Sequence, residues 1–119
     1  KNSNDPQIVK KMMASWYLAK AVEQFTKRLK LISVKFPDTE MPKLIVKSLR
    51  TRWGSMSSKG VLTLNVKLVR APLKCIDYII THELCHIRHM NHGAAFWREL
   101  SQVMPKWAQI KQKLEIVMS

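Results

Sequence analysis

Residues 72–92 read PLKCIDYIITHELCHIRHMNH, and most of what the sequence reveals about fold and chemistry lies in this stretch. Proline suits the first position of a helix, and the apolar residues that follow recur at steps of three and four. We therefore expect a helix from Pro72 to about His89. Its apolar stripe consists of Leu73, Ile76, Ile80, Leu84 and Ile87. His82 and His86 lie well round the helix from that stripe.

The run His82-Glu83-Leu84-Cys85-His86 has the spacing of a zinc site. Two histidines four residues apart on a helix point their rings the same way, so both can bind one Zn²⁺ ion. Glu83 is turned about 100° round the helix from His82 and approaches only the outer sphere of the metal. There it would act as the catalytic base that takes a proton from water and passes it to the leaving amine.

The third zinc ligand has three candidates. His89 falls on the same helical face, but one straight helix would spread it and the first two histidines over about 10 Å. Glu99 would give the two-histidine, one-glutamate set that some zinc enzymes use. His92 is preferred, because it follows the expected end of the helix and its neighbours Asn91 and Gly93 allow the chain to turn back under the metal.

Two other interpretations compete with a catalytic zinc site. His82 and His86 could be ordinary polar residues, although a glutamate beside them in the most hydrophobic helix would then be hard to explain. Alternatively, a basic binding module could keep the metal as a structural part in a closed four-ligand site. Cys85 is the only nearby soft ligand that could close it, and it points to a different side of the helix.

Composition limits the class of protein. With 119 residues, of which 46% are hydrophobic, we expect one domain over residues 1–119, and no apolar run is long enough to cross a bilayer. Cys75 and Cys85 are about 15 Å apart along the expected helix, too far to bridge, which favours a reducing, cytoplasmic setting. The net charge of +13 indicates nucleic acid or another polyanion as a possible partner.

Upstream, Asp5-Pro6 has the pattern of a helix start, with Asp5 as the N-cap. The helix should run from residue 6 to about residue 34. We expect its apolar residues to face the core, namely Leu18, Val22, Phe25, Leu29 and Ile32, with Met12, Met13, Trp16 and Tyr17 extending the same packed surface.

The segments 44–50 and 61–66 are rich in β-branched residues and predict strands, separated by a turn at 57–60. Together they suggest a small antiparallel sheet of two or three strands. Two further amphipathic helices are expected after Gly93 and from Pro105. The predicted fold class is therefore α+β.

Six short motifs occur in order along the chain: Arg50-Thr51-Arg52-Trp53-Gly54-Ser55, Leu62-Thr63-Leu64-Asn65, Ile76-Asp77-Tyr78, His82-Glu83-Leu84-Cys85-His86, Asn91-His92 and Phe96-Trp97. This set closely resembles the YgjP-like zinc metallopeptidases, which are related to the SprT and WLM proteases. The resemblance implies a minimal zincin-like fold with helices packed on a small sheet. It also implies His82, His86 and His92 as ligands of one Zn²⁺ and Glu83 as the catalytic base.

The chain departs from that family pattern in two places. Met56 stands where such sequences usually have cysteine, at a position with no proposed ligand role. The strand-rich N-terminal portion that the family usually carries is not in this sequence, which suggests a piece of a longer protein. The relatives include proteases that act on DNA-bound proteins, an analogy that agrees with the basic charge.

Several single residues have more than one interpretation. Trp53 could form a wall of the substrate cleft or a core contact. Asn65 could hold a substrate backbone or cap a turn, and the turn is preferred. Asp77 could support the metal ligands from behind or be exposed, and exposure is preferred. Tyr78 and Arg52 are the candidates for stabilising an oxyanion. The resulting hypothesis is a zinc-dependent peptidase whose sheet edge binds an extended peptide substrate.

Overall fold

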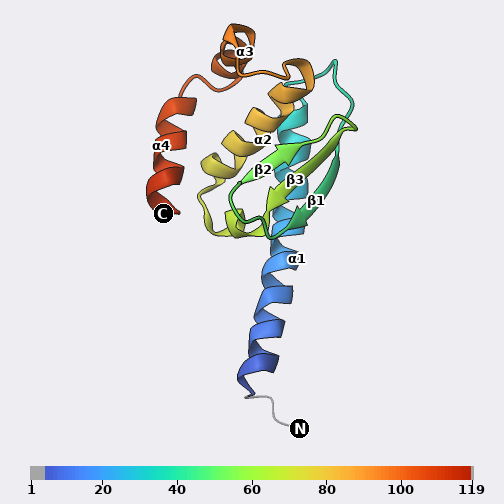
Figure 1. The fold of residues 1–119 in the computed structure, drawn as a ribbon, viewed down its shortest axis with the longest axis vertical. Helices are drawn as coiled ribbons and strands as arrows, with labels where there is room; N and C mark the ends of the chain where they lie inside the picture. The colour runs from blue at the N-terminus through green and yellow to red at the C-terminus, as the bar shows by residue number, and fades with distance from the viewer. Residues whose placement is uncertain (1–4, 119) are drawn as a thin grey trace.

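The computed structural model describes residues 5–118, so residues 1–4 and Ser119 of the expected domain lie outside the described part. Helices and strands follow one another in the order α1 (Pro6–Ser33), β1 (Lys43–Lys47), β2 (Gly54–Met56), β3 (Val61–Asn65), the 3₁₀ helix η1 (Val66–Arg70), α2 (Leu73–Arg88), α3 (Ala94–Val103) and α4 (Trp107–Val117). Helix α2 lies at the centre, with the sheet and α1 on one side, α4 on the other, and α3 across its C-terminal end (Figure 1). The predicted α+β class is confirmed.

Helix α1 begins as predicted. The Asp5 carboxylate accepts a hydrogen bond from the Gln7 backbone N–H at 2.9 Å, and Pro6 occupies the first turn, where its lack of an N–H costs nothing. Although α1 has 28 residues, neither it nor another helix within residues 5–118 is long and apolar enough to cross a membrane.

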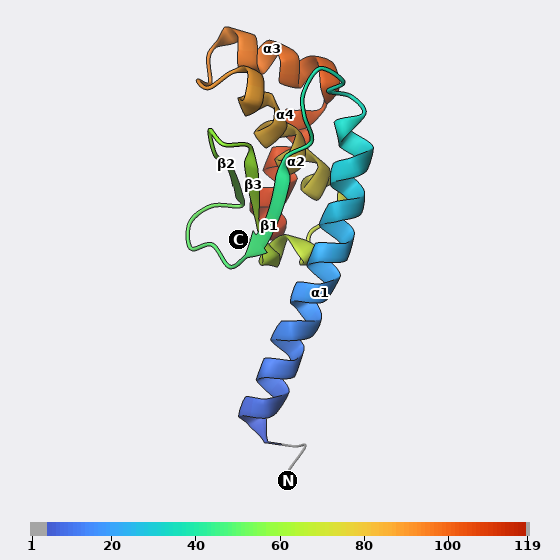
Figure 2. The same ribbon diagram turned by 90° about the vertical axis from the view of Figure 1, so that its right-hand side faces the viewer.

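Only the C-terminal half of α1 packs on the body of the protein, through Ala21, Phe25, Leu29 and Ile32. The N-terminal half projects away from it (Figure 2). The expectation that the whole apolar face is buried is therefore wrong: exposed side chains include Met12, Met13, Trp16, Leu18 and Val22. Periodicity alone predicted core packing here, but no described element lies opposite these residues.

The predicted antiparallel pairing of the two main strands is also wrong. The sheet has the order β1-β3-β2, in which β1 runs parallel to β3 and β2 runs antiparallel to it. The difference arises in residues 48–53, which carry the chain past β3 to form β2 before the turn at 57–60 returns it. As a result, β2 pairs with one strand only and its outer edge is free within the described part of the sheet.

Asn65 holds this crossing segment in place. Its Nδ2 donates to the carbonyl oxygens of Leu49 and Arg52 at 3.0 and 2.9 Å, and its Oδ1 accepts from the Lys67 N–H that starts η1. The side chain is buried, so these bonds satisfy polar groups that water does not reach. The expectation that Asn65 caps a turn is confirmed.

Gly54 lets β2 approach α2 closely. A Cβ atom there would lie 3.1 Å from side-chain atoms of Ile79 and Leu64 and 3.2 Å from the Thr63 carbonyl oxygen, which is backbone and cannot move aside easily. We expect Gly54→Ala to lower the free energy of unfolding by about 1–3 kcal/mol, measured by chemical denaturation. Gly93→Ala is the matched control, since nothing lies near that position. Equal stability of the two variants would contradict the close packing.

Helix α2 is buried over its central part. Ile76, Ile80 and Leu84 of the predicted stripe are buried, whereas Leu73 and Ile87, near its two ends, are exposed. Both cysteines are buried and free, as predicted from their separation.

Asp77 joins α2 to α1. Asp77 was expected to be exposed, but it is partly buried. It accepts two hydrogen bonds from Arg28, at 2.8 and 2.7 Å, in a bidentate ion pair. This pair raises the pKa of Arg28. The ion pair fixes α2, and so the histidines it carries, against the longest helix.

Candidate metal centre

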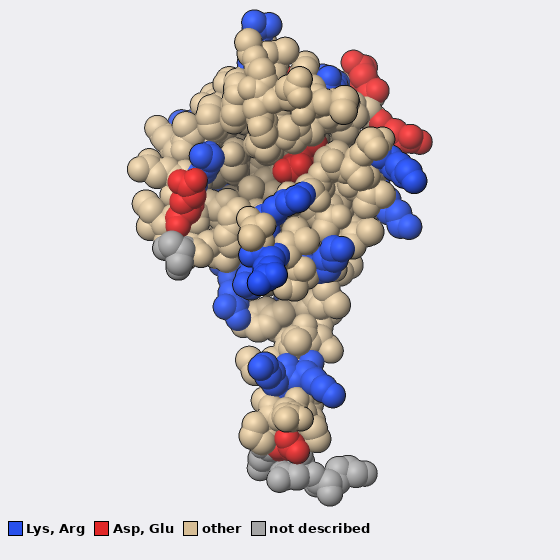
Figure 3. Space-filling view, in the orientation of Figure 1, with Lys and Arg blue, Asp and Glu red and all other residues tan. Residues whose placement is uncertain are grey.

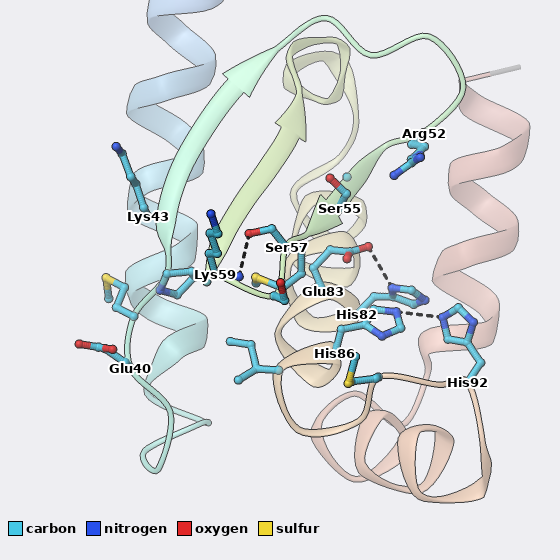
Figure 4. A pocket seen from close by; sticks show the side chains of 18 residues that line it. Glu40, Lys43, Arg52, Ser55, Ser57, Lys59, His82, Glu83, His86 and His92 are labelled. Carbon is cyan, nitrogen blue, oxygen red and sulfur yellow. Dashed lines mark hydrogen bonds and ion pairs between the residues drawn. The ribbon is translucent and has the colours of Figure 1, made fainter.

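The structure brings together the three histidines predicted as ligands. His82 and His86 project from consecutive turns of α2, with ring centroids 5.0 Å apart, and His92 approaches from the loop before α3 (Figure 4). Each ring offers a nitrogen, and these three atoms all lie within 4.8 Å of one another. The Nε2 atoms of His86 and His92 are 2.9 Å apart. Residues on two separate elements thus converge on one point.

The chain reaches this arrangement by ending α2 at His89. This residue has an extended backbone (φ −133°, ψ 101°), while its N–H still bonds to the Cys85 carbonyl. The chain bends over residues 90–93, where Asn91 and Gly93 are expected to let it turn back, although Gly93 is extended (φ −87°, ψ −173°) and Gly60 alone among residues 5–118 has positive φ. Ordinary extended residues suffice to bring His92 back.

The end of α2 also orients His86. Its Nδ1 lies 3.1 Å from the His89 carbonyl oxygen, which can only accept, so the proton sits on Nδ1 and the Nε2 lone pair faces the other histidines. Histidines that bind a metal through one ring nitrogen usually donate the other ring N–H to a carbonyl or carboxylate oxygen, which fixes the orientation of the ring. His82 has comparable support, since its Nδ1 lies 3.2 Å from Glu83 Oε2.

The two alternative third ligands contact each other instead. His89 Nε2 is 3.1 Å from Glu99 Oε1, and Glu99 also pairs with Arg88, whose guanidinium reaches Asp38 at 3.7 Å. Within the described residues, neither His89 nor Glu99 belongs to the group of side chains that could share an ion. The Arg88–Glu99 ion pair, with His89 beside it, joins α3 to the end of α2.

Glu83 is buried, with 8% of its surface exposed, yet it lines the cleft beside the histidines. Figure 4 shows its carboxylate beside the His82 ring, with Ser55 of β2 on the other side. Burial in the core would be costly for an isolated charge, and contact with the cleft and with His82 relieves that cost. A carboxylate held in this position can accept a proton from a group bound near the histidines.

Tryptophan contacts support His92, and no role in the site was predicted for Trp97 from the sequence. The Trp97 Nε1–H donates to the His92 carbonyl oxygen at 3.0 Å, and its ring lies 5.5 Å from the His92 ring. On the other side, Trp97 stacks on Trp107 of α4, with centroids 4.8 Å apart. The exposed loop histidine is therefore held by two packed helices.

We expect Trp97→Phe to weaken zinc binding about 10-fold, since the variant keeps a ring but loses the bond to the His92 carbonyl, and groups that support ligands typically contribute 10–100-fold. Competition with a chromophoric chelator measures this. Trp107→Phe is the control, because it also loses an indole hydrogen bond, to Ser101, but leaves His92 untouched. The same affinity in both variants would contradict the positioning role.

The donor set suits a divalent transition metal. Imidazole nitrogens are typical ligands for zinc, and the three here lie within 4.8 Å of one another, close enough to share one ion. The pKa of His92 is lowered, first by desolvation and then by the neighbouring His86 and His82, which favours the neutral, metal-binding form. Cys85 does not complete a fourth ligand: it is buried, and desolvation raises its pKa to about 12, so its thiol stays protonated.

A cleft of about 880 Å³ runs past the histidines, between α2, β2 and the segment before β1. Of the two candidates for stabilising an oxyanion, Arg52 lines this cleft, whereas Tyr78 is buried behind His82, 5.9 Å from its ring, and burial raises its pKa to about 12. Trp53 does not line it. Its ring packs against the core and borders a smaller recess, so the core interpretation holds.

Comparison with known proteins gives a consistent picture. The family model for the YgjP-like metallopeptidase domain matches residues 1–116. The metallopeptidase zymogen jannalysin of Methanocaldococcus jannaschii is 26% identical, with a TM-score of 0.71, over 80% of this chain and 97% of that one. The zymogen abylysin of Pyrococcus abyssi is 23% identical, with a TM-score of 0.70, over 76% and 90%, and shares the fold. No curated protein matches significantly.

The family model covers nearly the whole chain. The fold agrees with that of the solved metallopeptidase jannalysin, over 97% of the length of that chain. A cluster of three histidines beside a buried glutamate, on the wall of an open cleft, is what such an enzyme requires. The chain thus belongs to the YgjP-like metallopeptidase family and is a metal-dependent peptidase.

Proposed function

We propose that the metal is zinc, one ion per chain, held by His82, His86 and His92, and that the enzyme hydrolyses peptide bonds. The observation that carries this proposal is the convergence of three imidazole nitrogens within 4.8 Å beside a buried carboxylate that faces the cleft. Zinc held there supplies Lewis-acid chemistry, in that it acidifies water and polarises a carbonyl. Three protein ligands leave a fourth position open, as catalytic zinc sites do.

Glu83 is the proposed general base and acid. It takes a proton from the attacking water and returns one to the amine of the departing peptide. Its contact with His82 and its low exposure keep the carboxylate at the cleft wall rather than in bulk water. The two buried, free thiols agree with a reducing, cytoplasmic setting for this chemistry.

The substrate is proposed to bind as an added strand along β2. This strand has one partner, β3, and its residues 54–56 line the cleft, so its free edge can bond to the backbone of an extended peptide. Gly54 and Ser55 lie on the cleft wall with Glu83. A peptide on that edge would pass directly across the histidine cluster.

Proteins associated with nucleic acid are the proposed targets, on the basis of the +13 net charge, which favours binding near polyanions. The same charge supports a second candidate function, a basic binding module whose metal is structural. The two differ in whether a peptide is ever cut.

The test is to incubate the zinc-loaded protein with a mixed peptide library and with protein bound to DNA, and to map new termini by mass spectrometry. We expect cleavage that stops on addition of a chelator and returns on addition of zinc. If salt-dependent DNA binding is measured but no substrate is cut with or without DNA, the binding-module function replaces the peptidase.

A further inference from the structure

The walls of the cleft carry more positive than negative charge. Three basic side chains line it, those of Lys43, Arg52 and Lys59, and the acidic residues there are Glu83 and Glu40. Figure 3 shows an acidic group recessed in a hollow of this face, with basic groups along the margin below it. Since Glu83 is buried, the exposed charges of the cleft are three cations against Glu40 alone, and a substrate meets a net positive surface.

These three cations are free to pair with a ligand. Across residues 5–118, the charged groups of these three side chains form no ion pair and no hydrogen bond, although the backbones of Arg52 and Lys59 do form hydrogen bonds. Arg28 and Arg88 differ in this respect, because both are held by carboxylates of this chain. Lys43, Arg52 and Lys59 therefore have no carboxylate partner among residues 5–118.

The cations stand on both sides of the reaction centre. Arg52 precedes β2, whereas Lys59 lies in the turn that follows it, and Lys43 joins that turn through a bond from its N–H to the Gly60 carbonyl at 3.0 Å. Figure 4 shows Lys43 and Lys59 on one side of Glu83 and Arg52 on the other. Strand β2 lies between Arg52 and Lys59 in the sequence. Its three residues span about 10 Å, which is the length of about three residues of a peptide added beside it.

We infer that the enzyme selects acidic peptides, with Asp or Glu on each side of the scissile bond. This rests on the proposed function, since it assumes a peptide along β2. Side chains two residues apart in such a peptide point to one face, so acidic residues at two such positions, one on each side of the scissile bond, can reach Arg52 and Lys59. All three cations are exposed at the cleft wall, so each pair with a substrate carboxylate is weak and sensitive to salt, and the positive field also steers acidic chains inward.

The experiment compares three peptides of equal length that carry Asp, Asn or Lys at the two flanking positions. Binding is measured to the zinc-loaded Glu83→Gln protein, and kcat/KM to the zinc-loaded wild type. We expect the Asp peptide to exceed the Asn peptide by roughly 10-fold in both measurements, as two or three weak pairs would give, and the Lys peptide to be poorest. The preference should shrink as salt is raised.

Lys59→Glu should lower the preference for the Asp peptide several-fold, while Lys30→Glu, an equal change of charge on exposed α1 outside the cleft, should leave it intact. Equal binding of all three peptides overturns the inference, as does an equal effect of both lysine variants. The inference is also overturned if single-stranded DNA displaces a bound peptide and the Asp and Asn peptides bind equally well. Preferred binding of the Asp peptide without cleavage would instead refute the peptidase function and leave the acidic preference standing.

Discussion

Glu83→Gln should reduce peptide hydrolysis by at least about 10²- to 10⁴-fold and leave zinc binding unchanged. The amide has the shape of the carboxylate and can still accept a hydrogen bond from His82 Nδ1, which lies 3.2 Å from Oε2 in the native site. It cannot hold a proton between water and the leaving amine. Hydrolysis of a quenched fluorescent peptide and metal content per chain give the two readouts.

Glu23→Gln is the matched control, because Glu23 is exposed on α1 and far from the cleft lining. It loses the same charge and should keep full activity. Comparable activity in Glu83→Gln and wild type would mean that another group moves the proton. Loss of zinc together with activity would mean that the carboxylate supports the metal rather than the chemistry.

His92→Ala should weaken zinc binding by more than about 100-fold, since it removes one of three ligands, and even groups that only support ligands contribute 10–100-fold. The fold should survive, because His92 is exposed in the loop before α3. Chelator competition measures the affinity, and the unfolding transition of the zinc-free protein checks the fold.

His89→Ala separates the two loop histidines. His89 pairs with Glu99 rather than with the cluster, so its replacement should cost some stability but change zinc affinity only a few-fold. Full zinc retention in His92→Ala, or a reversal of the two results, would contradict the proposed ligand set. Zinc affinity should also fall as the pH drops, because each imidazole must be neutral to bind the metal, and the lowered pKa of His92 favours its neutral form.

The sequence predicted the helix that carries His82 and His86, because a run of apolar residues at helical spacing is a local property. It also predicted that His92, rather than His89, would lie beside them, because a straight helix would spread His82, His86 and His89 over about 10 Å. The chain turns back over residues 90–93 as expected, but with an extended His89 and Gly93 and without a positive φ. Which residues meet was easier to predict than the backbone path that joins them.

Long-range pairings could not be read in the same way. Strand propensity does not encode the direction of a partner, so the parallel pairing of β1 with β3 and the three-residue strand β2 escaped prediction. Asp77 pairs with Arg28, 49 residues away, and nothing near Asp77 in the sequence signals that contact. Likewise, periodicity described the N-terminal half of α1 correctly as apolar on one side without showing that this side is exposed.

The most direct test of a zinc peptidase built on His82, His86, His92 and Glu83 is a titration of metal-free protein with zinc while peptide hydrolysis is recorded. Activity should rise in proportion to added zinc and stop rising at one equivalent per chain, and Glu83→Gln should bind the same equivalent without activity. Hydrolysis by the metal-free protein, or one equivalent of bound zinc with no hydrolysis of any peptide, would contradict the account.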